Sequence, residues 1–271
     1  MNISVKEYKP SHRLSDFIET YWMGTFNVKR DTNFSQHVVP NGCIELILHI
    51  SHDHCMLNKF GDSFYKSPPH TLLGIYSKPY IVKFSAPVNA FGIRFYPDGF
   101  RNILGVPPAK FLSNYEDGSD VVGKKLGELL SRIQEEDQIE SMLQHADHFF
   151  LHHLAKNQKN HDYTHLAMKI IRRENGIINF EKLTEKVPIS LRQLQREFRN
   201  TYGITITEYI RLSRLNAIHK YMLMNNANLS ELAHHLEFTD QSHFIREFRY
   251  YMGMPPKKFI GRRQHYIINA V

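Results

Sequence analysis

The spacing of apolar residues changes along the chain, from short runs in the first part to helical periodicity in the second. Up to about residue 110, apolar runs at 37–50, 72–85 and 89–100 lie between turn signals. Two of these signals are Pro-Asn-Gly at 40–42 and Pro-Asp-Gly at 97–99. Short strands separated in this way are typical of a β-sandwich or a small barrel, which we predict for this region.

Helical spacing begins near residue 120. The segments 123–133 and 139–155 carry large apolar residues three and four positions apart, as on one face of a helix. The polar segment 156–165 is predicted to be a linker, and the pattern beyond it is helical to about residue 263. The predicted organisation is therefore a β-rich domain at 1–115, a helical interdomain segment with its linker at 116–160, and an all-α domain at 161–271.

Composition and charge narrow the class of protein. No apolar run reaches the ~20 residues of a membrane span, and the first residues lack the apolar stretch of a signal peptide. With only two cysteines, Cys43 and Cys55, no disulfide framework is expected, and we predict a soluble cytoplasmic protein with no membrane partner. Residues 1–161 hold 17 Lys+Arg and 17 Asp+Glu, whereas residues 162–271 hold 17 Lys+Arg and 10 Asp+Glu, so the whole net charge of +7 lies in the second part. A polyanionic partner is expected for that part alone.

One segment occurs twice in the basic part, at 183–203 and 232–253. The copies align at an offset of 49 residues in their first half and 50 residues in their second. Each predicts a short scaffold helix, a turn, and a second helix with apolar residues on one side and arginines on the other. Ser190 and Asp240 are the predicted N-caps of the second helices, because their side chains can accept a backbone N–H. The side chains predicted to be buried in these helices are Leu194, Phe198, Phe244 and Phe248.

The outward faces of the two second helices suit DNA. A helix fits the major groove, where Arg pairs with guanine and Gln with adenine, while further Lys and Arg neutralise phosphates. Either helix alone has an equally good interpretation as a solvated surface helix, but the repetition favours two reading heads for double-stranded DNA. An architectural protein that coats DNA without sequence preference is disfavoured, because Gln and Arg stand together at the helix starts. The residues predicted to contact DNA are Ser190, Arg192, Gln193, Gln195, Arg196, Arg199, Gln241, Ser242, His243, Ile245, Arg246 and Arg249.

The segment between the copies, 206–225, predicts one long helix. About 18 helical residues span roughly 27 Å. This length is close to the ~34 Å between successive major grooves on one side of the duplex. A rigid helix of this length would hold both reading heads on one face of the DNA without dimerisation. Its predicted apolar face consists of Tyr209, Leu212, Leu215, Ile218 and Met222.

The helical part resembles the C-terminal domain of the AraC/XylS family of transcription regulators from about residue 165 to residue 260. The motifs that carry the resemblance are Ser190-x-Arg192-x-Leu194-x-Arg196-x-Phe198, Gly203-Ile204-Thr205 with Tyr209, Arg214-Leu215, and Phe238-x-Asp240-Gln241-Ser242-His243-Phe244-x-Arg246-x-Phe248 with Gly253. The resemblance implies base contacts from Arg192, Gln195 and Arg196 in the first copy and from Gln241, Ser242, Ile245 and Arg246 in the second, with His243 at the DNA backbone. The family usually has glycine in each turn, where this chain has Pro188 and Glu237. Proline cannot adopt a positive φ, so we expect the first turn to be built differently.

Residues 1–112 resemble the β-rich N-terminal domain of one branch of the same regulators, through the pieces 17–22, 39–47, 74–80 and 92–100. The resemblance implies a cupin-like barrel that senses a small-molecule effector or mediates homodimerisation. RNA polymerase would be a further partner if the protein is an activator. Arg94 could bind an anionic ligand or pair with Glu45 in a structural ion pair, and the aromatic residues could line a pocket or simply form core. The candidate ligand-binding residues are Trp22, Glu45, Tyr76, Arg94 and Tyr96.

A metal site is the competing hypothesis for the N-terminal part. His49, His52, His54 and Cys55 lie within seven residues, and imidazole and thiolate are zinc ligands. No second ligand cluster follows them, and the motifs of nucleotide-binding and hydrolytic enzymes are absent, so no metal, cofactor or catalytic residue is predicted. The sequence thus predicts a multidomain α and β protein, with a β-rich cupin-like barrel before an all-α domain that carries two helix-turn-helix motifs. The predicted function is sequence-specific transcriptional regulation; the alternative is a metal-binding cupin-like enzyme or metal sensor with an attached DNA-binding module.

Overall fold

The chain forms two compact units. The computed structural model describes residues 2–31, 34–58, 63–112, 115–157, 163–224, 233–234, 236, 238, 240–260 and 266–267. One unit consists of Met1–Ser35, Cys43–Ile75 and Val82–Asn160, and the other of Gln36–Gly42, Tyr76–Ile81 and His161–Val271. We call them the N-terminal unit and the C-terminal unit.

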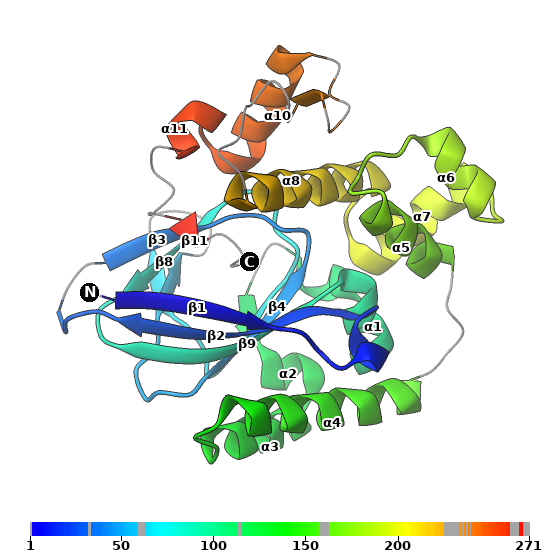
Figure 1. Ribbon diagram of the computed structural model, residues 1–271. Helices are drawn as coiled ribbons and strands as arrows, with labels where there is room; N and C mark the ends of the chain where they lie inside the picture. Colours follow the sequence, from blue (N-terminus) through cyan, green and yellow to red (C-terminus); the bar gives the residue numbers. More distant parts are fainter. Residues whose placement is uncertain are drawn as a thin grey trace. The chain divides into compact units, whose positions relative to one another are not determined.

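A six-stranded antiparallel sheet of order β1-β2-β9-β4-β7-β10 is the frame of the N-terminal unit (Figure 1). The central strands β9 and β4 are buried along nearly their whole length. Most residues on both faces of these strands are therefore apolar, with Glu45, His49 and Arg94 as buried exceptions, which explains why 44–49 and 88–95 read as near-continuous apolar runs in the sequence. The strands of this sheet are β1 (Asn2–Tyr8), β2 (Ile18–Asn27), β9 (Val88–Phe95), β4 (Ile44–His49), β7 (His70–Leu73) and β10 (Tyr115–Asp117).

A second sheet has the strand order β11-β3-β8-β5-β6, in which β11 pairs with β3 in parallel. Its strands are β3 (Phe34–Val38), β5 (Met56–Asn58), β6 (Phe64–Lys66), β8 (Tyr80–Phe84) and β11 (Tyr266–Ile267). Within the described residues the strands form two sheets and not one closed barrel, so the predicted strand-rich architecture is confirmed and the closed barrel is wrong.

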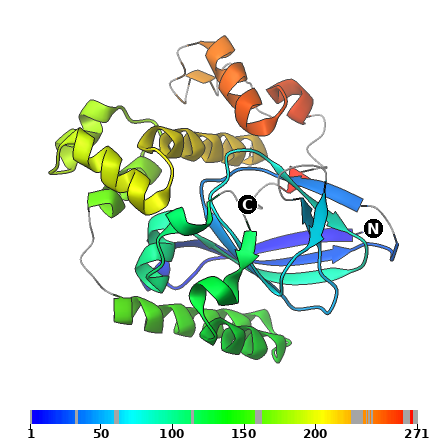
Figure 2. The ribbon, with the colours of Figure 1, turned by 180° about the vertical axis from the view of Figure 1, so that it is seen from behind.

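Four helices accompany the six-stranded sheet: α1 (Pro97–Leu104), α2 (Gly118–Val122), α3 (Lys125–Gln134) and α4 (Ile139–Asn157), with the 3-10 helices η1 (His12–Leu14) and η2 (Pro108–Phe111). The predicted helices at 123–133 and 139–155 are confirmed by α3 and α4, which lie side by side in Figures 1 and 2. The ring of Phe150 on α4 packs edge-on against Phe95 of β9, with 5.1 Å between centroids, which ties the helices to the sheet. The predicted turn at 97–99 is wrong. Pro97 opens a helix, because the first helical position needs no backbone N–H donor.

The C-terminal unit is mainly helical, apart from its portions of β3 and β8 and the short strand β11. Its helices are α5 (Tyr163–Arg173), α6 (Phe180–Lys186), α7 (Leu191–Tyr202), α8 (Ile206–Met224), α10 (Gln241–Met252) and α11 (Pro256–Ile260). Helices α5, α6 and α7 gather at one end of α8, and α10 and α11 lie at the other end (Figures 1 and 2). The predicted long helix at 206–225 is confirmed by α8, and its predicted apolar face is buried at Tyr209, Leu212, Leu215, Ile218 and Met222. Of the helices in the described part of the chain, none is both long and apolar enough to span a membrane.

Candidate nucleic-acid interface

Helices α7 and α10 begin with the same kind of cap. The Ser190 hydroxyl accepts a hydrogen bond from the backbone N–H of Gln193 at 3.3 Å, and the Asp240 carboxylate accepts one from the N–H of His243 at 2.7 Å. Each cap satisfies a donor that the first helical turn leaves without a partner. Both predicted N-caps are therefore confirmed.

The two helices also end in the same way. Gly203 and Gly253 are in the left-handed conformation, with φ of 73° and 71°. Their N–H groups donate to the carbonyls of Arg199 at 2.8 Å and Arg249 at 2.9 Å. Glycine takes a positive φ without a steric cost, which explains its presence at both ends. From cap to cap, the second helix repeats the first at an offset of 50 residues.

Each helix buries one face and exposes the other. The side chains of Leu194, Phe198, Phe244 and Phe248 are at most 1% exposed, as predicted. Ser190, Arg192, Gln193, Gln195, Arg196, Arg199, Gln241, Ser242, Ile245, Arg246 and Arg249 are exposed, and His243 is half-buried. The sequence therefore placed the outward face of each helix correctly, whereas the contact of these residues with DNA stays a prediction.

An acidic residue stands at the same position in both helices and is held by protein neighbours. The Gln193 amide donates to Glu197 at 2.8 Å. Glu247 faces the His243 imidazole at 3.4 Å and the Arg211 guanidinium at 4.0 Å. Through these contacts the side chains of Gln193 and His243 point toward the acidic residue one helical turn later, in the direction of the C-terminus.

The first turn, which the sequence predicted to depart from the usual geometry, does so. Helix α6 ends at Lys186, and its C-cap Val187 has an extended backbone with φ of −119°. The N–H of Ile189 donates back to the Val187 carbonyl at 2.8 Å. None of residues 187–190 has a positive φ, so Pro188 fits without strain. In the second copy Leu229, Leu232 and Glu237 lie outside the described residues, whereas Ala233, Leu236 and Phe238 are described and buried.

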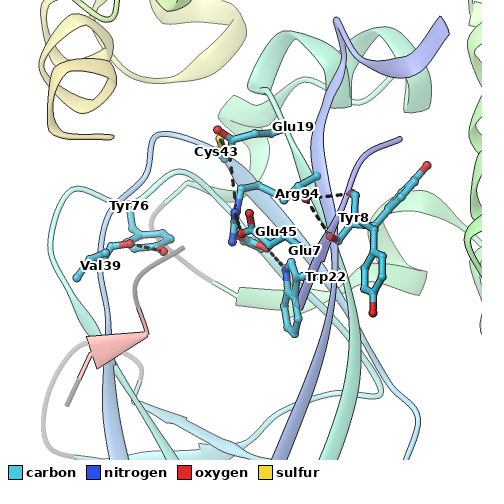
Figure 3. Close-up of polar contacts among 11 residues, drawn as sticks. Glu7, Tyr8, Glu19, Trp22, Val39, Cys43, Glu45, Tyr76 and Arg94 are labelled. Atoms are coloured by element: carbon cyan, nitrogen blue, oxygen red, sulfur yellow. Dashed lines mark hydrogen bonds and ion pairs between the residues drawn. The ribbon is translucent and has the colours of Figure 1, made fainter. Parts of the chain in front are cut away.

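Three of the five candidate ligand residues come together on the six-stranded sheet of the N-terminal unit (Figure 3). Glu45 of β4 pairs with Arg94 of β9 in the strand register, and Arg94 Nε donates to Glu45 Oε1. The indole N–H of Trp22 donates to Glu45 Oε2 at 2.9 Å. Of the two interpretations of Arg94, the ion pair with Glu45 is the one that the structure has.

Two further carboxylates, missed in the sequence, complete this acidic cluster around Arg94. Arg94 Nη1 lies 2.8 Å from Glu7 Oε1, and Arg94 Nε lies 3.9 Å from Glu19 Oε2. Burial raises the pKa of Glu7 above its ordinary value, against the opposing effect of Arg94. Burial alone would lower the pKa of Arg94, but Glu45, Glu19 and Glu7 raise it well above its ordinary value. Only the register of β1 with β2, which sets Glu7 opposite Trp22, reveals this neighbourhood.

The remaining two candidates, Tyr76 and Tyr96, are not part of this cluster. The Tyr76 hydroxyl donates to the Val39 carbonyl at 2.9 Å (Figure 3). Tyr96 immediately precedes α1, and its backbone N–H donates to the carbonyl of Phe17 at 3.0 Å. The five residues proposed from the sequence thus do not form one ligand site around Arg94.

The histidine-rich segment forms a buried polar contact. His49 Nε2 lies 3.1 Å from Ser67 Oγ and 3.6 Å from Cys55 Sγ, and the rings of His49 and His54 stack at 4.6 Å between centroids. Burial lowers the pKa of His49 to about 4 and raises the pKa of Cys55 to about 11, so both are neutral near pH 7. His52 is exposed. Across the described ranges, no three His, Cys, Asp or Glu side chains are grouped so that they could hold a metal ion.

Family models match both parts of the chain. Residues 183–262 match a helix-turn-helix domain, which covers α7, α8 and α10. Residues 6–117 match a domain of unknown function, DUF6597, which covers the six-stranded sheet. The boundary between the two matches leaves α3, α4 and α5 outside both.

Curated relatives match within the helical part. The HTH-type transcriptional activator RhaS of Escherichia coli O157:H7 is 26% identical over 80 residues, which is 30% of this chain and 29% of the relative. The multiple antibiotic resistance protein MarA of Salmonella typhimurium is 29% identical over 88 residues, which is 32% of this chain and 69% of the relative. The matched residues thus span less than a third of the length of RhaS.

Solved structures of ToxT from Vibrio cholerae have a similar fold over most of the chain. One matches at a TM-score of 0.50 with 11% identity, covering 89% of this chain and 98% of ToxT. Another, with TM-score 0.51 and 15% identity, covers the same shares. Residues 183–262 are thus a helix-turn-helix domain, and the helical part of the chain is similar to the transcriptional activator RhaS and to MarA.

Proposed function

We propose that the protein regulates transcription by reading two neighbouring stretches of double-stranded DNA with α7 and α10. The observation that carries this proposal is the repeated helix. Two helices 50 residues apart share their caps and their buried positions, and each exposes arginine and polar side chains near its start. A single basic helix would be ordinary, but two matched ones on a unit with all of the net charge favour DNA.

The reading side chains are proposed in two roles. Arg192, Gln195 and Arg196 of α7 and Gln241, Ser242, Ile245 and Arg246 of α10 contact base edges. Ser190, Gln193, Arg199, His243 and Arg249 contact the DNA backbone or position the readers. The orientation of Gln193 and His243 toward Glu197 and Glu247 supports this division, since both side chains are turned away from the helix start. The 19 residues of α8 span about 28 Å, close to the ~34 Å between successive major grooves.

Regulation is assigned to the N-terminal unit, through an effector, dimerisation or both. One ToxT structure is bound to (E)-4-(8-methylnaphthalen-1-yl)but-3-enoic acid, an organic acid. In the present chain Trp22, Glu45 and Arg94 are already hydrogen-bonded to one another, and we propose that they support the sheet and do not receive an acid. We place the protein in the cytoplasm, with RNA polymerase as a partner if it activates transcription.

The first test is selection of bound sites from a random DNA library at near-physiological salt. The expected result is a motif with two conserved blocks about one helical turn apart. Recovery of DNA without an enriched motif, both with and without added metabolite pools, would reject sequence reading. A motif that appears only with metabolites would support an effector.

Substitution of one reader from each helix tests the assignment of the blocks. Arg196→Ala and Arg246→Ala are each expected to lose about 1–3 kcal/mol of binding free energy at the selected site, with relaxed base preference in one block only. Arg173→Ala, which removes an exposed charge at the end of α5, is the control and should keep the wild-type base preference. Unchanged preferences in both reader variants would contradict the assignment.

A further inference from the structure

Helix α8 sets one side chain, that of Arg214, against both helix-turn-helix units. Its guanidinium donates to the carbonyl of Gly176 from Nη2 at 2.9 Å and from Nε at 3.3 Å. On the other side, its Cζ lies 5.2 Å from the centre of the Phe238 ring. Gly176 follows α5, which shares one buried hydrophobic cluster with α6 and α7 of the first helix-turn-helix unit. Phe238 stands two residues before the cap of α10 in the second.

The contact with Gly176 is built closely. Gly176 has φ of 71°, and its N–H donates to the Ile171 carbonyl at 2.9 Å, as at the end of a helix that closes with a left-handed glycine. A Cβ at this position would collide with the carbonyl of Ile210 and lie 2.7 Å from the backbone nitrogen of Arg214. The end of α5 thus lies directly on the backbone of α8, and a cation there is favoured by the helix dipole.

The contact with Phe238 leads to the second recognition helix. Phe238 is 8% exposed, and its N–H donates to the Ala233 carbonyl at 3.0 Å. Its ring packs on Phe244 of α10 with 5.2 Å between centroids. A guanidinium within about 6 Å of an aromatic face is attracted by the ring, and the attraction strengthens when both groups are shielded from water. Arg214 is half-buried at this point.

We propose that Arg214 is a positioning residue that couples the two recognition helices and thereby fixes the spacing between the two DNA blocks. The proposal rests on the proposed function. The guanidinium of Arg214 hydrogen-bonds the Gly176 carbonyl at its edge, and its flat face contacts the Phe238 ring. The orientation of each helix-turn-helix unit about α8 therefore depends on the same side chain. Arg211 of α8 also forms an ion pair with Glu247 of α10, at 4.0 Å. Because the Arg211 side chain is 51% exposed, this pair holds α10 on α8 less firmly than the half-buried Arg214 does.

The experiment compares full sites with half sites. Probes carry both selected blocks, the first block only, the second block only, or both blocks with the spacer changed by one base pair. The variants are Arg214→Met, which keeps an unbranched apolar stem, and Phe238→Leu, which keeps an apolar plug and removes the ring. The double variant completes a double-mutant cycle. Arg173→Met is the matched control, because it removes a charge beside Gly176 from an exposed side chain.

The expected result is a selective loss. Arg214→Met should bind each half site within about two-fold of wild type and the full site about ten-fold more weakly, with a smaller penalty for a changed spacer. Phe238→Leu should show the same pattern, and the double variant should lose no more than the larger single loss. Equal weakening on half and full sites, or no weakening on either, would overturn the proposal, and so would additive losses in the cycle. If wild type itself fails to prefer a two-block site, the proposed function fails first, and the positioning role falls with it.

Discussion

Replacement of Arg94 is the sharpest test of what holds the N-terminal unit together. In Arg94→Met, the carboxylates of Glu7, Glu19 and Glu45 lose the arginine with which all three form ion pairs. The side chains of Glu19 and Glu45 are less than 10% exposed, so water does not replace the lost partner. Removal of one partner from a buried ion pair typically costs about 3–5 kcal/mol, because the remaining charge stays buried without compensation.

The loss should depend on pH in a defined direction. Burial already raises the pKa of Glu7 with Arg94 beside it, and loss of Arg94 removes the effect that opposes burial. A group whose folded-state pKa is raised destabilises the fold at high pH, and the effect vanishes below its unfolded value, near pH 4.5. Each unit by which such a pKa rises adds about 1.4 kcal/mol to the loss at pH 7. The stability difference between variant and wild type should therefore shrink as the pH falls from 7 to 5.

Urea unfolding followed by tryptophan fluorescence measures this difference. Trp22 is the single tryptophan of the chain, and its indole is hydrogen-bonded to Glu45, so the signal comes from the affected unit. The control is Arg30→Met, which breaks an exposed ion pair with Asp53 and should cost about 0–1 kcal/mol at either pH. A loss below about 1 kcal/mol for Arg94→Met, or the same loss at pH 7 and pH 5, would refute the reasoning.

Five further substitutions test the caps, a close backbone approach and a buried histidine. Ser190→Ala and Asp240→Ala each remove a capping hydrogen bond and should lower the free energy of unfolding by about 1 kcal/mol in denaturant titrations. Gly176→Ala should lower it by about 2 kcal/mol or more, because its Cβ meets the backbone of α8, whereas Gly253→Ala, at the same φ of 71° with open space around it, should lose only about 1 kcal/mol. Burial of neutral His49 stabilises the fold above pH 6.5, and this contribution, up to about 3 kcal/mol, is lost as the pH falls toward 4. His49→Gln should therefore flatten the stability profile between pH 6.5 and 4; an unchanged profile would contradict this account.

The C-terminal unit was predictable from the sequence because its features are local. The cap of α7, its buried pair Leu194 and Phe198, and its outward arginines all lie within one helix, at spacings of three and four residues. The second copy repeated the pattern and removed the ambiguity of the first. The turn at Pro188 was predicted only to differ; its extended path followed from the missing positive φ but was not derivable in detail.

The acidic cluster around Arg94 was only partly predictable, because it is built from strands that are distant in the chain. Glu45 could be proposed as a partner, since it stands in an apolar run as Arg94 does. Glu7 and Glu19 could not, because their contacts depend on the order β1-β2-β9-β4 and on the register within it. A different limit, an ambiguous local signal, explains the turn predicted at 97–99, where Pro-Asp-Gly begins α1. A local signal for chain reversal and a local signal for a helix start share their first residue.

The exposed base readers and the buried acidic cluster around Arg94 differ in how well they tolerate substitution. Arg196 and Arg246 are exposed, and their replacement removes few contacts within the protein, so base preference can alter at little cost in stability. Arg94 is buried among carboxylates, and nearly any replacement removes the cation that these carboxylates share. Arg214 stands between these cases: it is half-buried, touches no predicted base reader, and contacts both helix-turn-helix units. Substitutions at such a position should alter the spacing that the protein accepts before they alter the bases that it reads, because spacing depends on how the units are held and base preference on what each unit exposes.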